Sequence, residues 1–88
     1  MKTIILNGCD IISMSDIHKI FAEELDFPEW YGRDLDALYD CLGDVCEEVE
    51  IVIEDKAELS EKLGIGFDRL CNLLNDISEE NDNIGLSF

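Results

Sequence analysis

The stretch that decides the fold is residues 27–44, FPEWYGRDLDALYDCLGD. It holds the only Pro, the only Trp and both Tyr residues of the protein. It predicts an aromatic loop that leads into a helix over residues 34–43, with an apolar stripe formed by Leu35, Leu38 and Leu42. The opposite helical face carries Asp36, Tyr39, Asp40 and Gly43. Because two like charges one helical turn apart repel each other, this face favours docking of a cationic group.

Composition narrows the class of protein. The 88 residues, 47% of them hydrophobic, predict one globular domain over residues 1–88. The net charge of −16 argues against binding to nucleic acid or to an anionic membrane, and is compatible with a basic partner. No apolar run approaches the roughly 20 residues that span a bilayer. Asn7, Gly8 and Asp10 interrupt the segment that a signal peptide needs, so we expect a cytoplasmic protein.

Apolar patterning along the whole chain predicts the order β-α-α-β-α-α-β. We expect strands over residues 3–6, 49–54 and 84–88, and helices over 14–25, 34–43, 55–63 and 66–80. Helices between successive strands require crossover connections, so the fold class is α/β with a small parallel sheet packed with helices. Residues 3–6, Thr-Ile-Ile-Leu, show no polar alternation, which predicts burial of the first strand on both faces.

Several single residues carry local expectations. Ser13 and Asp16 are spaced as a capping box at the start of the first helix. His18, the only histidine, has no second histidine or nucleophile motif beside it, so we expect a solvated helix residue. In the loop after Pro28, we expect one of the two aromatics, Trp30 or Tyr31, to cap the core.

The sequence offers no signature of a metal or redox site. No cysteine pair has C-x-x-C spacing, so we expect no metal or cofactor and free, structural thiols at Cys9, Cys41, Cys46 and Cys71. Asp34-x-Asp36 begins like a calcium loop, but the pattern then fails at Leu38, Tyr39 and Val45. Asp36 and Asp40 could act as paired catalytic carboxylates, but no desolvating pocket is evident, so we expect a protein that is not an enzyme.

The stretch from Pro28 to Leu42 resembles the signature of the barstar family, the intracellular inhibitors of the bacterial ribonuclease barnase. That signature is Pro-Glu-Tyr-Tyr-Gly-x-Asn-Leu-Asp-Ala-Leu-Trp-Asp-Cys-Leu. The resemblance extends along essentially the whole chain, including residues 4–8, 13–18, 52–54 and the strand that begins at Ile84. It implies a three-stranded parallel sheet and an inhibitor that blocks its nuclease with the second helix and the loop before it.

The resemblance also implies roles for individual residues. Asp40 matches the acid that takes the place of the RNA phosphate, and Asp36 matches a second acid one turn earlier. Trp30 matches an aromatic that packs on the catalytic histidine of the nuclease, and Tyr39 matches the Trp beside the key acid. The expected partner-binding set is Trp30, Gly32, Asp36, Tyr39, Asp40, Gly43, Asp44, Asp76 and Glu80.

Four departures from the family signature, at five positions, bear on which nuclease fits. The aromatics at Trp30 and Tyr39 are exchanged, Asp34 replaces an Asn, Arg33 adds a positive charge, and Val45 replaces a Trp. We expect a monomer that binds a basic, secreted-type ribonuclease one to one, as an antitoxin or immunity protein. The alternative is an acidic immunity module for a different basic toxin or regulatory partner.

Overall fold

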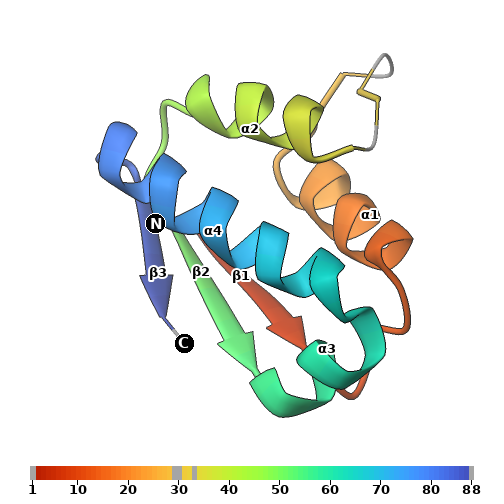
Figure 1. Cartoon of the computed structure of the whole chain (residues 1–88). Helices are drawn as coiled ribbons and strands as arrows, with labels where there is room; N and C mark the ends of the chain where they lie inside the picture. The colour runs from red at the N-terminus through yellow and green to blue at the C-terminus, as the bar shows by residue number, and fades with distance from the viewer. Residues whose placement is uncertain (1, 29–30, 33, 88) are drawn as a thin grey trace.

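The computed structural model describes residues 2–28, 31–32 and 34–87. Its elements confirm the predicted order β-α-α-β-α-α-β (Figure 1). The three strands are β1 (Lys2–Asn7), β2 (Val49–Glu54) and β3 (Ile84–Ser87). The four helices are α1 (Met14–Glu24), α2 (Leu35–Gly43), α3 (Lys56–Leu63) and α4 (Ile65–Glu80). These bounds differ from the expected ones by at most one residue at each end.

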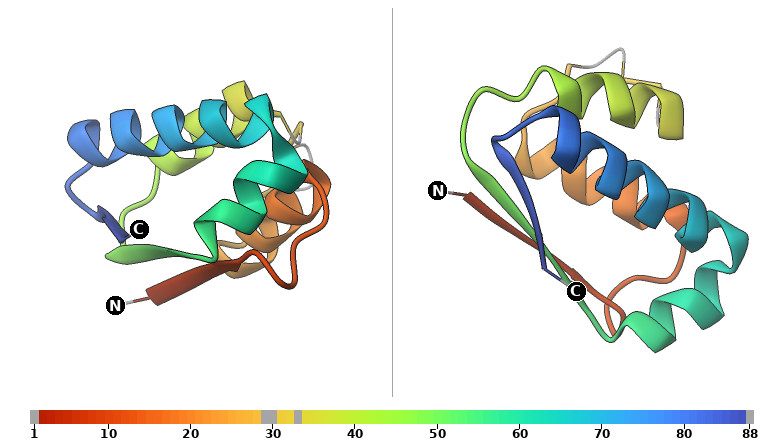
Figure 2. Two further views of the ribbon diagram at one scale, coloured as in Figure 1. Left: turned by 60° about the horizontal axis from the view of Figure 1, so that its bottom comes forward. Right: turned by 60° about the vertical axis from the view of Figure 1, so that its left-hand side comes forward.

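The strands form one parallel sheet in the order β1-β2-β3. Ile4 pairs with Ile51, and Ile51 pairs with Leu86, so the register aligns apolar side chains across the sheet. All four helices lie over the same face of this sheet (Figure 2). Strand and helix residues meet there in the core, whose fully buried members include Ile4, Leu6, Ile17, Phe21, Leu38, Leu42, Ile51, Phe67, Leu70 and Leu74.

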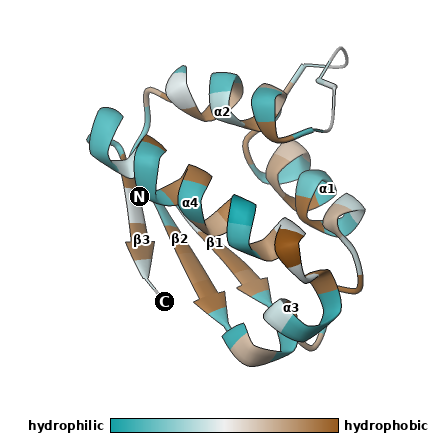
Figure 3. Ribbon diagram, in the orientation of Figure 1, coloured by the Kyte–Doolittle hydropathy of each residue, from teal (hydrophilic) through white to brown (hydrophobic). Residues whose placement is uncertain are grey.

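The expectation that β1 is buried on both faces was wrong. Ile4 and Leu6 are buried, but Ile5 between them is 50% exposed. Because every helix packs on one face, side chains of alternate strand positions point to the open face. Ile5 lies beside Val52 of β2 there, and Val52 is half-buried. The strands are hydrophobic along most of their length, whereas the outer helical surfaces are polar (Figure 3).

Side-chain caps fix where α1 and α2 begin. Asp16 Oδ2 accepts a hydrogen bond from the backbone N–H of the N-cap Ser13 (3.3 Å), which is the Asp16 half of the predicted capping box, and a second from the N–H of Ile12 (2.9 Å). Asp34 is the N-cap of α2, and its Oδ1 accepts from the N–H of Ala37 at 2.7 Å. Asp34 therefore stabilises the start of α2, where its negative charge also interacts favourably with the helix dipole.

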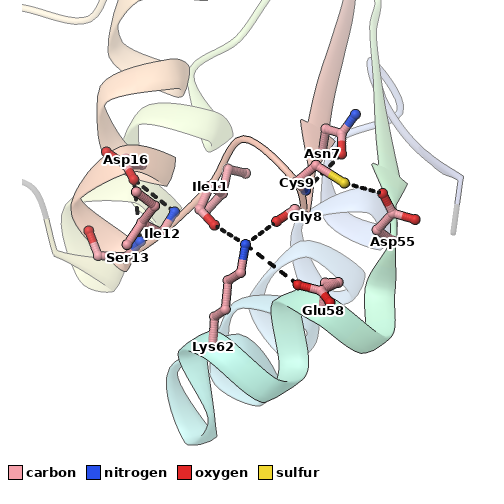
Figure 4. Close-up of polar contacts among 10 residues, drawn as sticks. All are labelled: Asn7, Gly8, Cys9, Ile11, Ile12, Ser13, Asp16, Asp55, Glu58 and Lys62. Atoms are coloured by element: carbon pink, nitrogen blue, oxygen red, sulfur yellow. Dashed lines mark hydrogen bonds and ion pairs between the residues drawn. The ribbon is translucent and has the colours of Figure 1, made fainter.

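Lys62 of α3 ties down the loop between β1 and α1 (Figure 4). Its Nζ donates to the carbonyl oxygens of Gly8 (2.6 Å) and Ile11 (3.2 Å) and pairs with Glu58 at 3.6 Å. Gly8 has no room for a side chain, because a Cβ there would lie 2.6 Å from the carbonyl oxygen of Asp55. These contacts lie at the end of the sheet opposite α2 (Figure 1).

Candidate functional site

Asn81, just after α4, holds the C-terminal end of α2 in place. Its side-chain Nδ2 donates to the carbonyl oxygens of Leu42 and Val45, each at 3.0 Å. The Leu42 carbonyl is one of the last four of α2, which have no N–H partner within the helix, and Val45 follows the C-cap Asp44. Gly43 faces Ile77, and a Cβ added there would lie 3.7 Å from Ile77 Cδ1. The two helices therefore lie side by side (Figure 1).

A groove of about 300 Å³ runs between α2 and α4. Five of the nine residues predicted for partner binding line it: Tyr39, Asp40, Gly43, Asp44 and Glu80. Asp36 and Asp76 are exposed on the same two helices, each one turn before a groove acid. The structure thus brings together acids from two segments separated by more than thirty residues of sequence.

Tyr39 and Glu80 join the two sides of this groove. The Tyr39 hydroxyl donates a hydrogen bond to Oε2 of Glu80. That hydrogen bond, with smaller contributions from burial and from the charges of Glu80, Asp76 and Asp40, raises the pKa of Tyr39 to about 12. Tyr39 therefore remains a protonated donor throughout the physiological pH range.

We call the exposed carboxylates of Asp36, Asp40, Asp44, Asp76 and Glu80 the acidic face. None of the described residues that line the groove is basic. Lys62 pairs with Glu58 on α3, away from this face. The acidic face consequently keeps its negative potential for a ligand.

The loop before α2 is described only in part. Trp30, predicted to contact the partner, lies outside the described residues, as does Arg33. Gly32 is exposed, and Tyr31 is the loop aromatic that caps the core, being 7% exposed. The Tyr31 ring packs edge-on against Phe27 with centroids 5.0 Å apart.

The expectation that His18 is solvated was wrong. His18 is 5% exposed, and its Nδ1 lies 2.5 Å from the hydroxyl of Tyr31. The loop before α2 therefore places the Tyr31 hydroxyl against the His18 ring of α1. Helical periodicity puts His18 only at the edge of the apolar stripe of α1 and does not predict this partner. Such long-range pairing, thirteen residues apart, leaves no periodic signal in the sequence.

Asn81 is the positioning residue that the sequence pattern did not reveal. The run Asn81-Asp82-Asn83 is typical of a turn, and the structure gives it a further role. Asn83 Nδ2 also donates to the carbonyl of Val45, at 3.3 Å, and Asn83 N–H donates to Asn81 Oδ1 at 3.0 Å. Both side chains hold the end of α2 against the turn that follows α4.

All four cysteines are free thiols. Cys41 and Cys71 are half-buried, and burial is the main cause that raises the pKa of each. Cys9 and Cys46 are exposed, and their Sγ atoms donate hydrogen bonds to Oδ2 of Asp55 at 3.2 Å and to the carbonyl oxygen of Asp44 at 3.4 Å. Across residues 2–28, 31–32 and 34–87, no group of three or more His, Cys, Asp or Glu side chains could hold a metal ion, and no helix is long and apolar enough to cross a membrane.

The fold and the acidic face define a class of small α/β proteins that present carboxylates from two adjacent helices. The chain belongs to the barstar family: the family model described as barstar (barnase inhibitor) matches residues 1–88. Proteins of this family are inhibitors and not enzymes. The chain is also similar to the protein named "Putative ribonuclease inhibitor YrdF" of Bacillus subtilis (strain 168), with 35% identity over 81 residues. The match covers 91% of this chain and 89% of that protein.

Proposed function

We propose that this protein inhibits a basic, barnase-like ribonuclease by covering its active site with the acidic face, in a one-to-one complex. The observation that carries the proposal is the convergence of Asp40, Asp44 and Glu80 around one groove with no basic residue among its described lining. Family membership supports a ribonuclease as the partner. The residues of the acidic face, with Tyr39 and Gly43 of α2 and with Gly32 and Trp30 from the loop, are the proposed contacts.

Asp40 is the proposed substitute for the RNA phosphate. It is exposed near the centre of α2, where its carboxylate is accessible to cationic donors of a partner. Charge-assisted hydrogen bonds from Arg or Lys to a carboxylate are roughly twice as strong as neutral ones. A ribonuclease must present such cations to bind its substrate, so an inhibitor that pairs with them also removes them from catalysis.

The fixed geometry of the acidic face favours tight binding. Asn81 holds α2 from one end, and the Tyr39–Glu80 hydrogen bond joins α2 to α4. A surface that is ordered before association loses less conformational entropy when it binds. The excess negative charge of the chain in turn steers a basic enzyme towards this surface. A free monomer in the cytoplasm, serving as an antitoxin, fits such a role.

The test measures inhibition of a barnase-like ribonuclease by the full chain, using hydrolysis of RNA as the readout. Asp40→Ala is expected to weaken inhibition by at least about a hundredfold, because it strands cations of the enzyme without a partner. The matched control is Glu61→Gln, which removes one exposed negative charge from α3 at the other end of the molecule. Equal inhibition by the wild type and Asp40→Ala overturns the proposal.

A further inference from the structure

A second and larger groove, of about 460 Å³, lies between the end of α1 and the end of α2. We call it the α1–α2 groove. Leu25, Phe27 and Val45 are half-buried and form an apolar floor together with the half-buried Cys41. Sites for ligands are commonly concave and apolar with a few polar groups that fix orientation.

The rim of the α1–α2 groove is acidic. Asp26, Asp44 and Glu47 line it, all three are exposed, and none of its described lining residues is basic. Asp44 also lines the groove between α2 and α4, so the two grooves meet at the C-terminal end of α2. The α1–α2 groove is therefore continuous with the acidic face proposed to bind the nuclease.

Both walls of the α1–α2 groove are held by hydrogen bonds. Asp26, which follows the C-cap Leu25 of α1, has a positive φ of 55°, and the N–H of Phe27 donates to the carbonyl of Ala22 at 3.0 Å. This is the Schellman pattern, which fixes the path of the chain after a helix. On the other wall, Asn81 holds the carbonyl of Val45. The groove thus exists before any ligand arrives.

We propose that the α1–α2 groove is a second subsite for the nuclease and takes one long cationic side chain, Lys or Arg, from it. This inference rests on the proposed function. An apolar floor under an acidic rim matches a side chain whose alkyl stem is apolar and whose end is charged. The stem lies along Phe27 and Val45, and the charge reaches Asp26 and Glu47. A basic partner that covers the acidic face carries such side chains at its margin.

The first test isolates the subsite with small probes and the intact chain. Amide NMR signals are followed during titration with n-butylguanidinium or with n-butanol, which has the same stem without the charge. We expect n-butylguanidinium to shift the signals of Phe27 and Val45 at concentrations at least about fivefold lower than n-butanol does, equivalent to about 1 kcal/mol. Equal responses to the two probes overturn the subsite.

Paired variants separate local binding from general attraction to a negative protein. Asp26→Asn with Glu47→Gln removes two rim charges, and Asn tolerates the left-handed conformation at position 26. Glu23→Gln with Glu61→Gln removes two exposed charges elsewhere. The preference for n-butylguanidinium is expected to disappear in the first variant and to persist in the second. The same effect in both variants overturns the subsite.

The native cysteines report on the complex itself. Cys46 lines the α1–α2 groove, is exposed and precedes the start of β2, whereas the exposed Cys9 follows the end of β1 (Figure 4). Bound nuclease is expected to slow alkylation of Cys46 by iodoacetamide and to leave Cys9 unaffected. Unchanged alkylation of Cys46 in an inhibited complex overturns the subsite while the proposed function stands. If no ribonuclease is inhibited, the proposed function fails, and the probe titrations still decide whether the groove binds a cation.

Discussion

Asn81 Nδ2 lies 3.0 Å from the carbonyl oxygen of Leu42, and this contact places the end of α4 against the end of α2. Asn81→Ala removes that hydrogen bond and the one to Val45, which leaves part-buried carbonyls without this donor. We expect the free energy of unfolding in urea to fall by about 1–3 kcal/mol. Asn72→Ala, at an exposed position of α4, serves as the control and is expected to stay within about 0.5 kcal/mol of the wild type.

Tyr39 provides a spectroscopic test of the joint between α2 and α4. Its pKa is raised to about 12, from an ordinary value of 10.0, chiefly by the hydrogen bond to Glu80. Because the folded state resists ionisation of this phenol, its contribution to stability is complete below pH 10 and is lost as the pH rises towards 12. In Glu80→Gln, phenolate absorbance is expected to appear at lower pH than in the wild type. Identical titration curves would contradict the role of Glu80.

The two tyrosines are expected to differ in what their hydroxyl groups contribute. Tyr31 is buried and bonded to His18, so Tyr31→Phe is expected to lower the free energy of unfolding by about 0.5–1.5 kcal/mol. Tyr39→Phe removes an exposed hydrogen bond and is expected to change stability less. Urea unfolding of both variants makes the comparison, and an equal effect would contradict the burial of the His18–Tyr31 pair.

Gly64, between α3 and α4, is required by the backbone. Its φ is 58° and its ψ is −130°, a region that residues with a Cβ rarely adopt. A Cβ there would meet nothing within 4 Å, so the cost of Gly64→Ala is conformational and not steric. We expect Gly64→Ala to lower the free energy of unfolding, measured by thermal denaturation, by about 1–3 kcal/mol. A D-alanine placed at position 64 by chemical synthesis avoids that cost and is the control.

Long-range charge controls how fast the proposed complex forms. The chain carries a net charge of −16, and salt screens such charge beyond about 10 Å at 0.1 M. We expect the association rate with a basic ribonuclease, measured by stopped-flow fluorescence, to fall as salt rises, while the dissociation rate changes little. An association rate that does not depend on salt would show that steering plays no part.

The sequence predicted the order of elements well because each helix and strand carries a local, periodic apolar signal. Leu38 and Leu42 are buried and Asp36 and Asp40 exposed, as helical spacing requires. The open face of the sheet was not predicted, because the apolar Ile5 does not alternate with polar neighbours even though half of its surface is exposed. An apolar run marks a strand, but the arrangement of helices decides which of its faces is covered.

The candidate site also has a part that helical spacing predicts and a part that depends on contacts between distant segments. The acids of α2 follow from one helix and could be placed by spacing, whereas their meeting with Glu80 depends on how two distant helices pack. The hydrogen bonds of Asn81 and of His18 are also tertiary contacts, spanning 39 and 13 residues. Local patterns carry no information on such pairs, so these residues were expected to form a turn and a solvated surface.

In α2, the residues that stabilise the fold are different from the residues proposed to select the partner. In α2, only Leu38 and Leu42 are buried, and the ends of the helix are fixed by Asp34 and Asn81. Its outward positions can therefore be exchanged without disturbing the core. Under the proposed function, substitutions at the exposed Asp36 and Asp40 would match a new nuclease while Tyr39 keeps α2 joined to α4, so this fold can serve as a stable carrier for a family of inhibitors with different targets.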